Sequence, residues 1–140
     1  PLLGSDTWDN NTIVEATVGK NTELYVSTFY AEGGNADFEK GIKEWMNADS
    51  ARLEKNGGND MLAAVTVMGY DAYMVAVEAI KAAGSSDPAA IMAALPNVKY
   101  TGVSGEISFN ETGDANRDSA FIKTANTEKG VWDFEAVQKA

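Results

Sequence analysis

The 140-residue chain contains no cysteine and no histidine. It therefore has no thiolate nucleophile, no imidazole to act as a general base, and no sulfur or imidazole ligand for zinc. These absences remove most common enzyme mechanisms, so we expect a protein that is not an enzyme, with no catalytic residue, metal or cofactor. A carboxylate pair of the kind used by glycoside hydrolases is the alternative, but nothing in the sequence brings two carboxylates together.

Basic residues are few. Eleven lysines and arginines stand against 21 aspartates and glutamates, which gives a net charge of −10, and the basic residues are scattered along the chain. Because neutralising phosphates requires a basic surface, this composition disfavours nucleic-acid binding. Hydrophobic residues make up 44% of the chain, which is enough to build the core of one domain-sized unit.

One long apolar stretch, Leu62–Ala83, carries apolar residues at three- and four-residue steps, the period of a helix face. About 20 apolar residues suffice to cross a bilayer. Asp71 falls in the middle of this stretch, however, where a carboxylate costs about 2.5–3.5 kcal/mol on insertion scales. We therefore interpret the stretch as a core helix, covered on most of its sides, rather than as a membrane span.

Capping residues, glycines and prolines mark the ends of several helices. The main predicted helices cover residues 35–56, 60–83 and 88–95, with a shorter one from about 12 to 18. In the first of these, the residues expected to face the core are Phe38, Ile42, Trp45 and Leu53. Alternating patterns predict short strands over residues 23–30, 103–109, 119–124 and 131–134, the last two joined by a hairpin turn. This mixture indicates an α/β fold.

The loop after the first predicted strand holds the candidate ligand-binding residues. Pro1–Gly4 is typical of a short buried strand, and Asp6 and Trp8 follow at its carboxyl end, which is where open α/β sheets bind ligands. The Asp6 carboxylate could pair with an ammonium group, and the Trp8 indole could supply a face for a cation or an apolar wall. The structural alternative is an aspartate that shapes the loop and a tryptophan in the core.

Residues 110–118 place oxygen-bearing side chains at alternate positions, as calcium-binding loops do. Counted from Asp114, Ser119 occupies the sixth position, where such a loop needs glycine. Ala125 occupies the twelfth position, where such a loop needs glutamate. A solvated turn is therefore the better interpretation, and we expect no metal there.

Several segments, taken in order, resemble one family. They are Leu3–Trp8, Tyr25–Phe29, Gly69–Ala72, Ala79–Gly84, Tyr100–Asn110 and Gly113-Asp114. Along essentially its whole length the chain is similar to the type I periplasmic binding proteins, specifically the leucine/isoleucine/valine-type (branched-chain amino acid) substrate-binding proteins of ABC transporters. The resemblance implies a periplasmic binding protein-like I fold, in which two Rossmann-like α/β lobes joined by three crossing strands clamp a ligand. Family members are much longer, and the chain resembles their C-terminal portion.

The resemblance also implies a division of the chain and a role for two residues. The implied segments are the end of the second lobe (1–24), a hinge strand (25–31), the returning half of the first lobe (32–115) and the C-terminal hairpin of the second lobe (116–140). The family's acidic residue that receives the α-ammonium of the ligand corresponds to Asp6, and Trp8 lies near it as a pocket wall. The loops that bind the ligand carboxylate belong to the N-terminal half, so this piece alone should bind an amino acid weakly or not at all.

The implied function is capture of an amino acid, most readily a branched-chain one, for delivery to an ABC permease. The implied location is periplasmic or extracellular, with a lipid anchor as one option. A ligand-sensing domain of a receptor or regulator on the same fold is the alternative. Since a piece of a two-lobed protein leaves sheet edges and helix faces uncovered, we expect the isolated chain to self-associate or to swap elements with a second copy.

Overall fold

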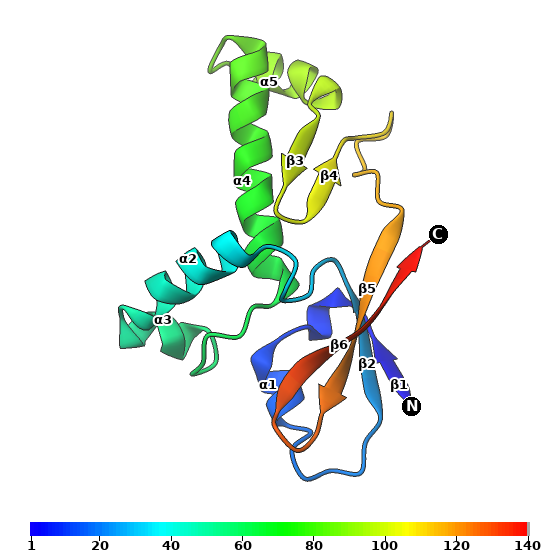
Figure 1. Cartoon of the computed structure of the whole chain (residues 1–140). Helices are drawn as coiled ribbons and strands as arrows, with labels where there is room; N and C mark the ends of the chain where they lie inside the picture. Colours follow the sequence, from blue (N-terminus) through cyan, green and yellow to red (C-terminus); the bar gives the residue numbers. More distant parts are fainter. Residues whose placement is uncertain (140) are drawn as a thin grey trace. The chain divides into compact units, whose positions relative to one another are not determined.

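The computed structural model describes residues 1–139, which divide into two compact units (Figure 1). The first unit contains Pro1–Thr66 together with the residues from Ser119 onward, and the second contains Val67–Asp118. Both units combine helices with strands, as the α/β pattern of the sequence predicts.

The first unit is built on a four-stranded mixed sheet. Its strands are β1 (Leu2–Gly4), β2 (Leu24–Thr28), β5 (Ser119–Asn126) and β6 (Val131–Lys139), in the order β1-β2-β5-β6. The pair β1/β2 is parallel, and the pairs β2/β5 and β5/β6 are antiparallel. Along β2 the side chains of Leu24, Val26 and Thr28 are buried, as its alternating sequence predicts.

The edge strand β1 differs from its prediction as a buried strand. Leu2 is 56% exposed and Leu3 is 70% exposed. The reason is position, because among the described residues β1 pairs with β2 alone and forms one edge of the sheet. At the opposite edge, the predicted hairpin of β5 and β6 is confirmed, and both strands run beyond their predicted ends.

A 3-10 turn and a short helix form the connection between β1 and β2. They are the turn η1 (Asp6–Trp8) and the helix α1 (Asn11–Glu15). The helix begins slightly before its predicted start, because the Asn10 side chain caps it by accepting a 3.0 Å hydrogen bond from Ile13 N–H. The helix also ends before residue 18, and turns continue the chain to Gly19, whose φ is +71°.

The helix predicted over residues 35–56 is two helices, α2 (Ala36–Asn47) and α3 (Ser50–Lys55). The break has a local cause, because the Asp49 carboxylate accepts a 2.9 Å hydrogen bond from Ala51 N–H and caps a new helix. The prediction that Trp45 faces the core is also wrong, since its side chain is 54% exposed. The Arg52 guanidinium covers one face of the indole, 4.3 Å from the ring centroid, and Met46 is the buried neighbour instead.

The long helix α4 (Ala64–Ala83) begins in the first unit and continues through the second. It starts four residues later than predicted, because the backbone before it is hydrogen-bonded elsewhere: Met61 N–H donates to the Asn59 side chain, and Leu62 N–H to Glu32. Tyr73 and Ile80 on this helix are exposed. The expectation that the helix is covered on most of its sides is therefore wrong for the described residues.

The second unit packs α4 against a short helix and a hairpin. These elements are α5 (Pro88–Ala94), the 3-10 turn η2 (Leu95–Asn97), β3 (Tyr100–Gly102) and β4 (Gly105–Ile107). The buried core residues of the unit are Val75, Ala79, Val98 and Ile107. The single strand predicted over 103–109 is wrong, because Val103 and Ser104 form the turn of the β3/β4 hairpin.

Asp71 explains why the chain turns at Val103 and Ser104. Its buried carboxylate accepts hydrogen bonds of 2.8 Å from the N–H groups of Val103 and Ser104, and one of 2.6 Å from Ser104 Oγ. A Cβ on Gly102 would lie 2.5 Å from this carboxylate, so the close approach requires glycine. The charge that argued against a membrane span therefore has a structural role.

Candidate ligand-binding site

The predicted site residues Asp6 and Trp8 lie in η1, directly after β1. Because β1 and β2 are parallel, η1 stands at the edge of the sheet where both strands have their carboxyl ends. Ligands of open α/β sheets bind at this edge. The structure thus gives both residues the location that their sequence position predicts, and their contact with a ligand stays a prediction.

The turn is closed by its own backbone and by a ring contact. Trp8 N–H donates to the Ser5 carbonyl and Asp9 N–H donates to the Asp6 carbonyl, both at 3.0 Å. The Trp8 indole lies against the backbone of Gly4, where an added Cβ would approach the ring to 2.7 Å. With 42% of its surface exposed, Trp8 is not a core residue.

The Asp6 side chain is half-buried. Within residues 1–139 its carboxylate makes no hydrogen bond or ion pair. A carboxylate in this state keeps its acceptor atoms available and is partly shielded from water, which strengthens its attraction for a cation. The arrangement can bind an ammonium group.

Sequence reasoning missed the residues that anchor this turn. Asp9 is 2% exposed and forms an ion pair with Lys123 of β5, with the lysine Nζ 3.0 Å from Asp9 Oδ1. Farther along the loop, the Asn10 carbonyl accepts a hydrogen bond of 3.2 Å from Trp132 Nε1 of β6. A lysine in the middle of an apolar strand is the one signal in the sequence that pointed to a buried acidic partner.

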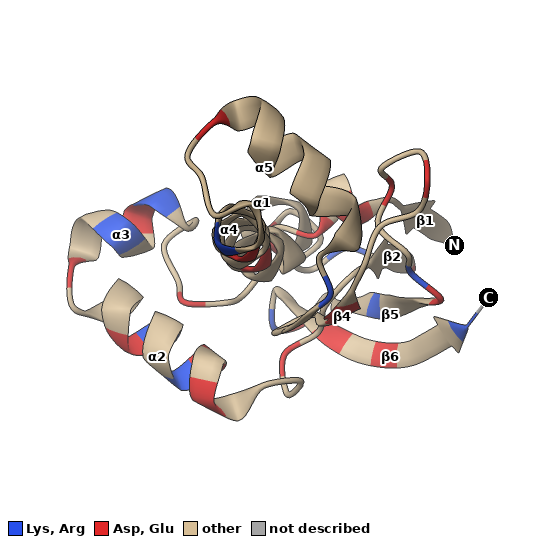
Figure 2. Cartoon of the chain, turned by 90° about the horizontal axis from the view of Figure 1, so that it is seen from above, with Lys and Arg blue, Asp and Glu red and all other residues tan. Residues whose placement is uncertain are grey.

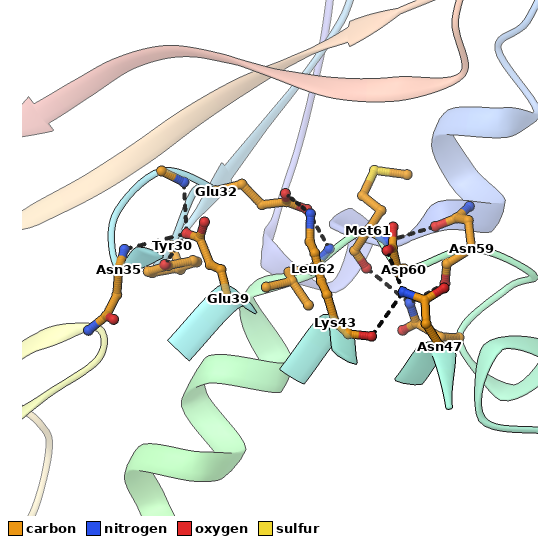
Figure 3. A network of polar contacts seen from close by, with 12 residues as sticks. Tyr30, Glu32, Asn35, Glu39, Lys43, Asn47, Asn59, Asp60, Met61 and Leu62 are labelled. Carbon is orange, nitrogen blue, oxygen red and sulfur yellow. Dashed lines mark hydrogen bonds and ion pairs between the residues drawn. The ribbon is translucent and has the colours of Figure 1, made fainter. Parts of the chain in front are cut away.

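The loop after β2 is fixed by Glu39 of α2 (Figure 3). One oxygen of this carboxylate accepts hydrogen bonds from Tyr30 Oη at 2.5 Å, Gly33 N–H at 2.7 Å and Asn35 N–H at 3.4 Å. Burial alone would raise the pKa of Glu39, but these hydrogen bonds outweigh it and lower the pKa. Burial and the contact with Glu39 together raise the pKa of Tyr30.

Glu32 joins this loop to the segment that precedes α4 (Figure 3). Its Oε1 accepts a 2.7 Å hydrogen bond from Leu62 N–H, and its Oε2 lies 2.5 Å from Lys43 Nζ. Burial would lower the pKa of Lys43, but the bond to Glu32 and its charge raise it. The loops after β1 and β2 are also linked through this segment, since Asn11 donates to Asn59 Oδ1 at 2.8 Å.

Other regions offer less to a ligand. The second unit has an apolar hollow between α4, α5 and β4, but Asp71 and Arg117, which help to line it, are both engaged with the turn at Ser104. In the loop of residues 110–118, Asn110 Oδ1 accepts hydrogen bonds from Thr112 N–H and Asp114 N–H and organises a turn. Acidic and basic side chains are interspersed along α2 and α3 rather than gathered by sign (Figure 2).

Comparison with known proteins decides the family. The family model described as periplasmic binding protein matches residues 3–129, which is most of the chain. The chain belongs to the periplasmic binding protein family. This is a family of binding proteins rather than enzymes, and its members work outside the cytoplasm. No curated protein matches the chain.

Two solved structures show how a periplasmic binding protein of this kind is built. The leucine-binding protein LivK from Thermotoga maritima is 31% identical over 98% of this chain and 37% of its own, with a TM-score of 0.73. An ABC transporter substrate-binding protein from Desulfitobacterium hafniense, solved in complex with Leu, is 22% identical over 96% of this chain and 35% of its own, with a TM-score of 0.63. The chain thus spans little more than a third of either protein.

These matches confirm the fold and family predicted from the sequence. The similarity to LivK extends over nearly the whole chain, so the type I resemblance rests on the complete set of elements rather than on one motif. The membrane alternative finds no support in residues 1–139, where no helix combines the length and the apolar character that a bilayer crossing requires.

Proposed function

We propose that this chain is part of an extracytoplasmic solute-binding protein that captures an amino acid, of branched-chain type, and delivers it to the permease of an ABC transporter. The observation that carries the proposal is the Asp6 carboxylate, which is half-buried at the carboxyl end of β1 and not engaged by other described residues. Family membership supports the binding role, and the similarity to LivK supports an amino acid as the ligand.

In the proposed complex, Asp6 accepts hydrogen bonds from the α-ammonium of the ligand and balances its charge. Such charge-assisted hydrogen bonds are shorter and stronger than neutral ones. Trp8, whose ring is held against Gly4, supplies a rigid apolar wall beside the ammonium. A carboxylate at this position favours ligands with an amine and leaves the choice among side chains to other parts of the site.

The proposed site is only one half of a clamp. We assign residues 1–24 and 116–140 to the second lobe of the whole protein, 25–31 to a hinge strand and 32–115 to the first lobe. Groups that bind the ligand carboxylate then come from the rest of the protein. Since affinity in a two-lobed protein depends on closure around the ligand, the 140-residue chain alone should bind weakly or not at all.

Calorimetric titration of the full-length protein that contains this chain, with a panel of amino acids, tests the proposal. One amino acid should bind tightly, and Asp6→Asn should raise its Kd by about 10- to 100-fold, since a hydrogen bond to a charged group contributes about 1.5–3 kcal/mol. The control is Asp37→Asn, which removes an exposed carboxylate on α2 and the same charge, and should leave the Kd unchanged.

The outcomes separate two parts of the proposal. If no amino acid of the panel binds, the assigned ligand class is wrong, and a sensing role with another ligand becomes the better explanation. If one binds equally well to wild type and to Asp6→Asn, the ligand class stands and the role of Asp6 is refuted.

A further inference from the structure

A buried carboxylate follows the candidate ligand-binding turn and joins it to three other elements. Both oxygens of Asp9 lie 3.0 Å from Lys123 Nζ on β5. Oδ2 also accepts hydrogen bonds of 2.9 Å from Thr28 Oγ1 at the end of β2 and from Ala64 N–H at the start of α4. Asp9 and Lys123 are both almost completely buried, and every polar atom of the pair has a partner.

Stability alone is a poor explanation for such a pair. Removing two charges from water is costly, and apolar residues of similar volume often give equal or greater stability. Lys123 follows Phe121 and Ile122 on β5, in a stretch where an aliphatic side chain would pack readily. The ion pair instead fixes the position of Asp9, because a carboxylate with three directed partners tolerates little displacement.

By fixing Asp9, the ion pair also fixes the position of the turn η1. Asp9 N–H donates the 3.0 Å hydrogen bond to the Asp6 carbonyl that closes η1, so a shift of Asp9 moves the residues that carry the candidate site. We propose that Asp9 and Lys123 are positioning residues for ligand binding, which hold η1 so that the Asp6 carboxylate meets the ammonium group of the ligand. This inference rests on the function proposed above.

Three variants of the full-length protein test the inference. Lys123→Met leaves the Asp9 carboxylate buried without its cation, and should lower both the melting temperature and the affinity. The double variant Asp9→Leu/Lys123→Met replaces the pair by apolar side chains and should recover most of the stability, yet keep an affinity at least tenfold weaker than wild type. The control Glu78→Leu/Lys81→Met removes a solvent-accessible ion pair on α4 and should change neither.

The double variant decides between positioning and a structural role. If its affinity returns to that of wild type together with its stability, the pair is structural and the inference is overturned. Should the double variant fail to fold, Thr28→Val removes one hydrogen bond to Asp9 Oδ2 at nearly constant volume. It should weaken binding about threefold with only a small decrease in melting temperature, and unchanged binding would likewise overturn the inference.

A readout that needs no ligand separates this inference from the proposed function. In protein labelled with 5-fluorotryptophan, the fluorine resonance of Trp8, assigned with Trp8→Phe, should shift or broaden in the double variant while that of Trp45 stays in place. An unchanged Trp8 resonance refutes the positioning role. If wild type binds no amino acid and the resonance still shifts, the proposed ligand fails but the pair is shown to position the turn.

Discussion

The Trp8 indole depends on a glycine four residues earlier in the chain. Its ring atoms occupy the space in which any side chain at position 4 would stand, so the identity of Gly4 determines where the indole lies. At this scale one hydrogen atom in place of a methyl group separates an ordered indole from a displaced one. The same reasoning applies to Gly102, whose lack of a side chain leaves room for the Asp71 carboxylate.

Gly4→Ala should displace the Trp8 ring and lower the free energy of unfolding by about 1–3 kcal/mol, the usual cost of overpacking. Chemical denaturation measures the loss, and the tryptophan fluorescence spectrum reports the displaced ring. Gly41→Ala on α2 is the matched control, since an added Cβ meets nothing within 4 Å there. It should stabilise the helix by about 0.5–1 kcal/mol. Equal effects of the two substitutions would contradict the steric explanation.

Glu39 gives the stability a defined dependence on pH. Its folded-state pKa lies below the usual 4.5, so its contribution to stability is complete above pH 4.5 and is lost as the pH falls through the lower, folded-state pKa. Glu39→Gln should therefore cost about 1 kcal/mol at pH 7, and the difference from wild type should shrink in acid. Denaturation curves between pH 3 and 7 measure it, with the exposed Glu44→Gln on the same helix as control. A difference that is constant over this range would contradict the assignment.

At the scale of elements, two buried carboxylates and a half-buried one determine where several segments turn or begin. Asp71 holds the turn between β3 and β4, Asp9 meets the first N–H of α4, and Glu39 fixes the loop between β2 and α2. In each case the carboxylate accepts hydrogen bonds from backbone groups that no neighbouring strand or helix would satisfy. At these three places the irregular backbone is therefore ordered by acidic side chains.

Asp71→Asn should loosen the β3/β4 hairpin, because the amide cannot accept all three hydrogen bonds that the carboxylate accepts now. We expect a loss of about 1–3 kcal/mol in the protection of the Val103 and Ser104 amides against hydrogen exchange. Thr101→Val removes an exposed hydrogen bond to Glu106 on the same hairpin and should change protection by less than about 0.5 kcal/mol. If the two variants lose protection equally, the buried clamp is not what holds the turn.

The parts of the fold that could be predicted from the sequence are those that depend on neighbouring residues in the chain. Caps, glycines and alternation depend on neighbours in the chain, and they placed β2, α4, α5 and the terminal hairpin, as well as Asp6 and Trp8 after β1. The break before Asp49 lay within reach of the same rules, since an aspartate in a helical pattern is a potential cap. The ion pair of Asp9 with Lys123 could not be predicted in this way, because no local rule connects residues on two distant elements.

At the scale of the whole molecule, the chain exposes surfaces that a self-contained domain covers. Leu2 and Leu3 stand exposed on β1, which among the described residues has a partner on one side only. The exposed side chains of Tyr73 and Ile80 add apolar surface on α4. Unpaired strand edges and apolar faces favour association with other chains.

We therefore expect the isolated 140-residue chain to form dimers or larger species as its concentration rises. Leu3→Lys should suppress this association, since a charged side chain on an edge strand opposes pairing with a second copy. Sedimentation velocity over a range of concentrations measures it, with the exposed Val18→Lys as the control for added charge. A monodisperse monomer at every concentration would refute the expectation.

The ion pair of Asp9 and Lys123 can form only after both residues have been synthesised. The two residues stand 114 positions apart, so the turn that carries Asp6 is translated well before its cationic partner. Until the ribosome has released β5, Asp9 has no lysine to meet and β2 lacks one of its two neighbours in the sheet. If the pair positions the turn as proposed, a polypeptide that ends before Lys123 should lack an ordered candidate site.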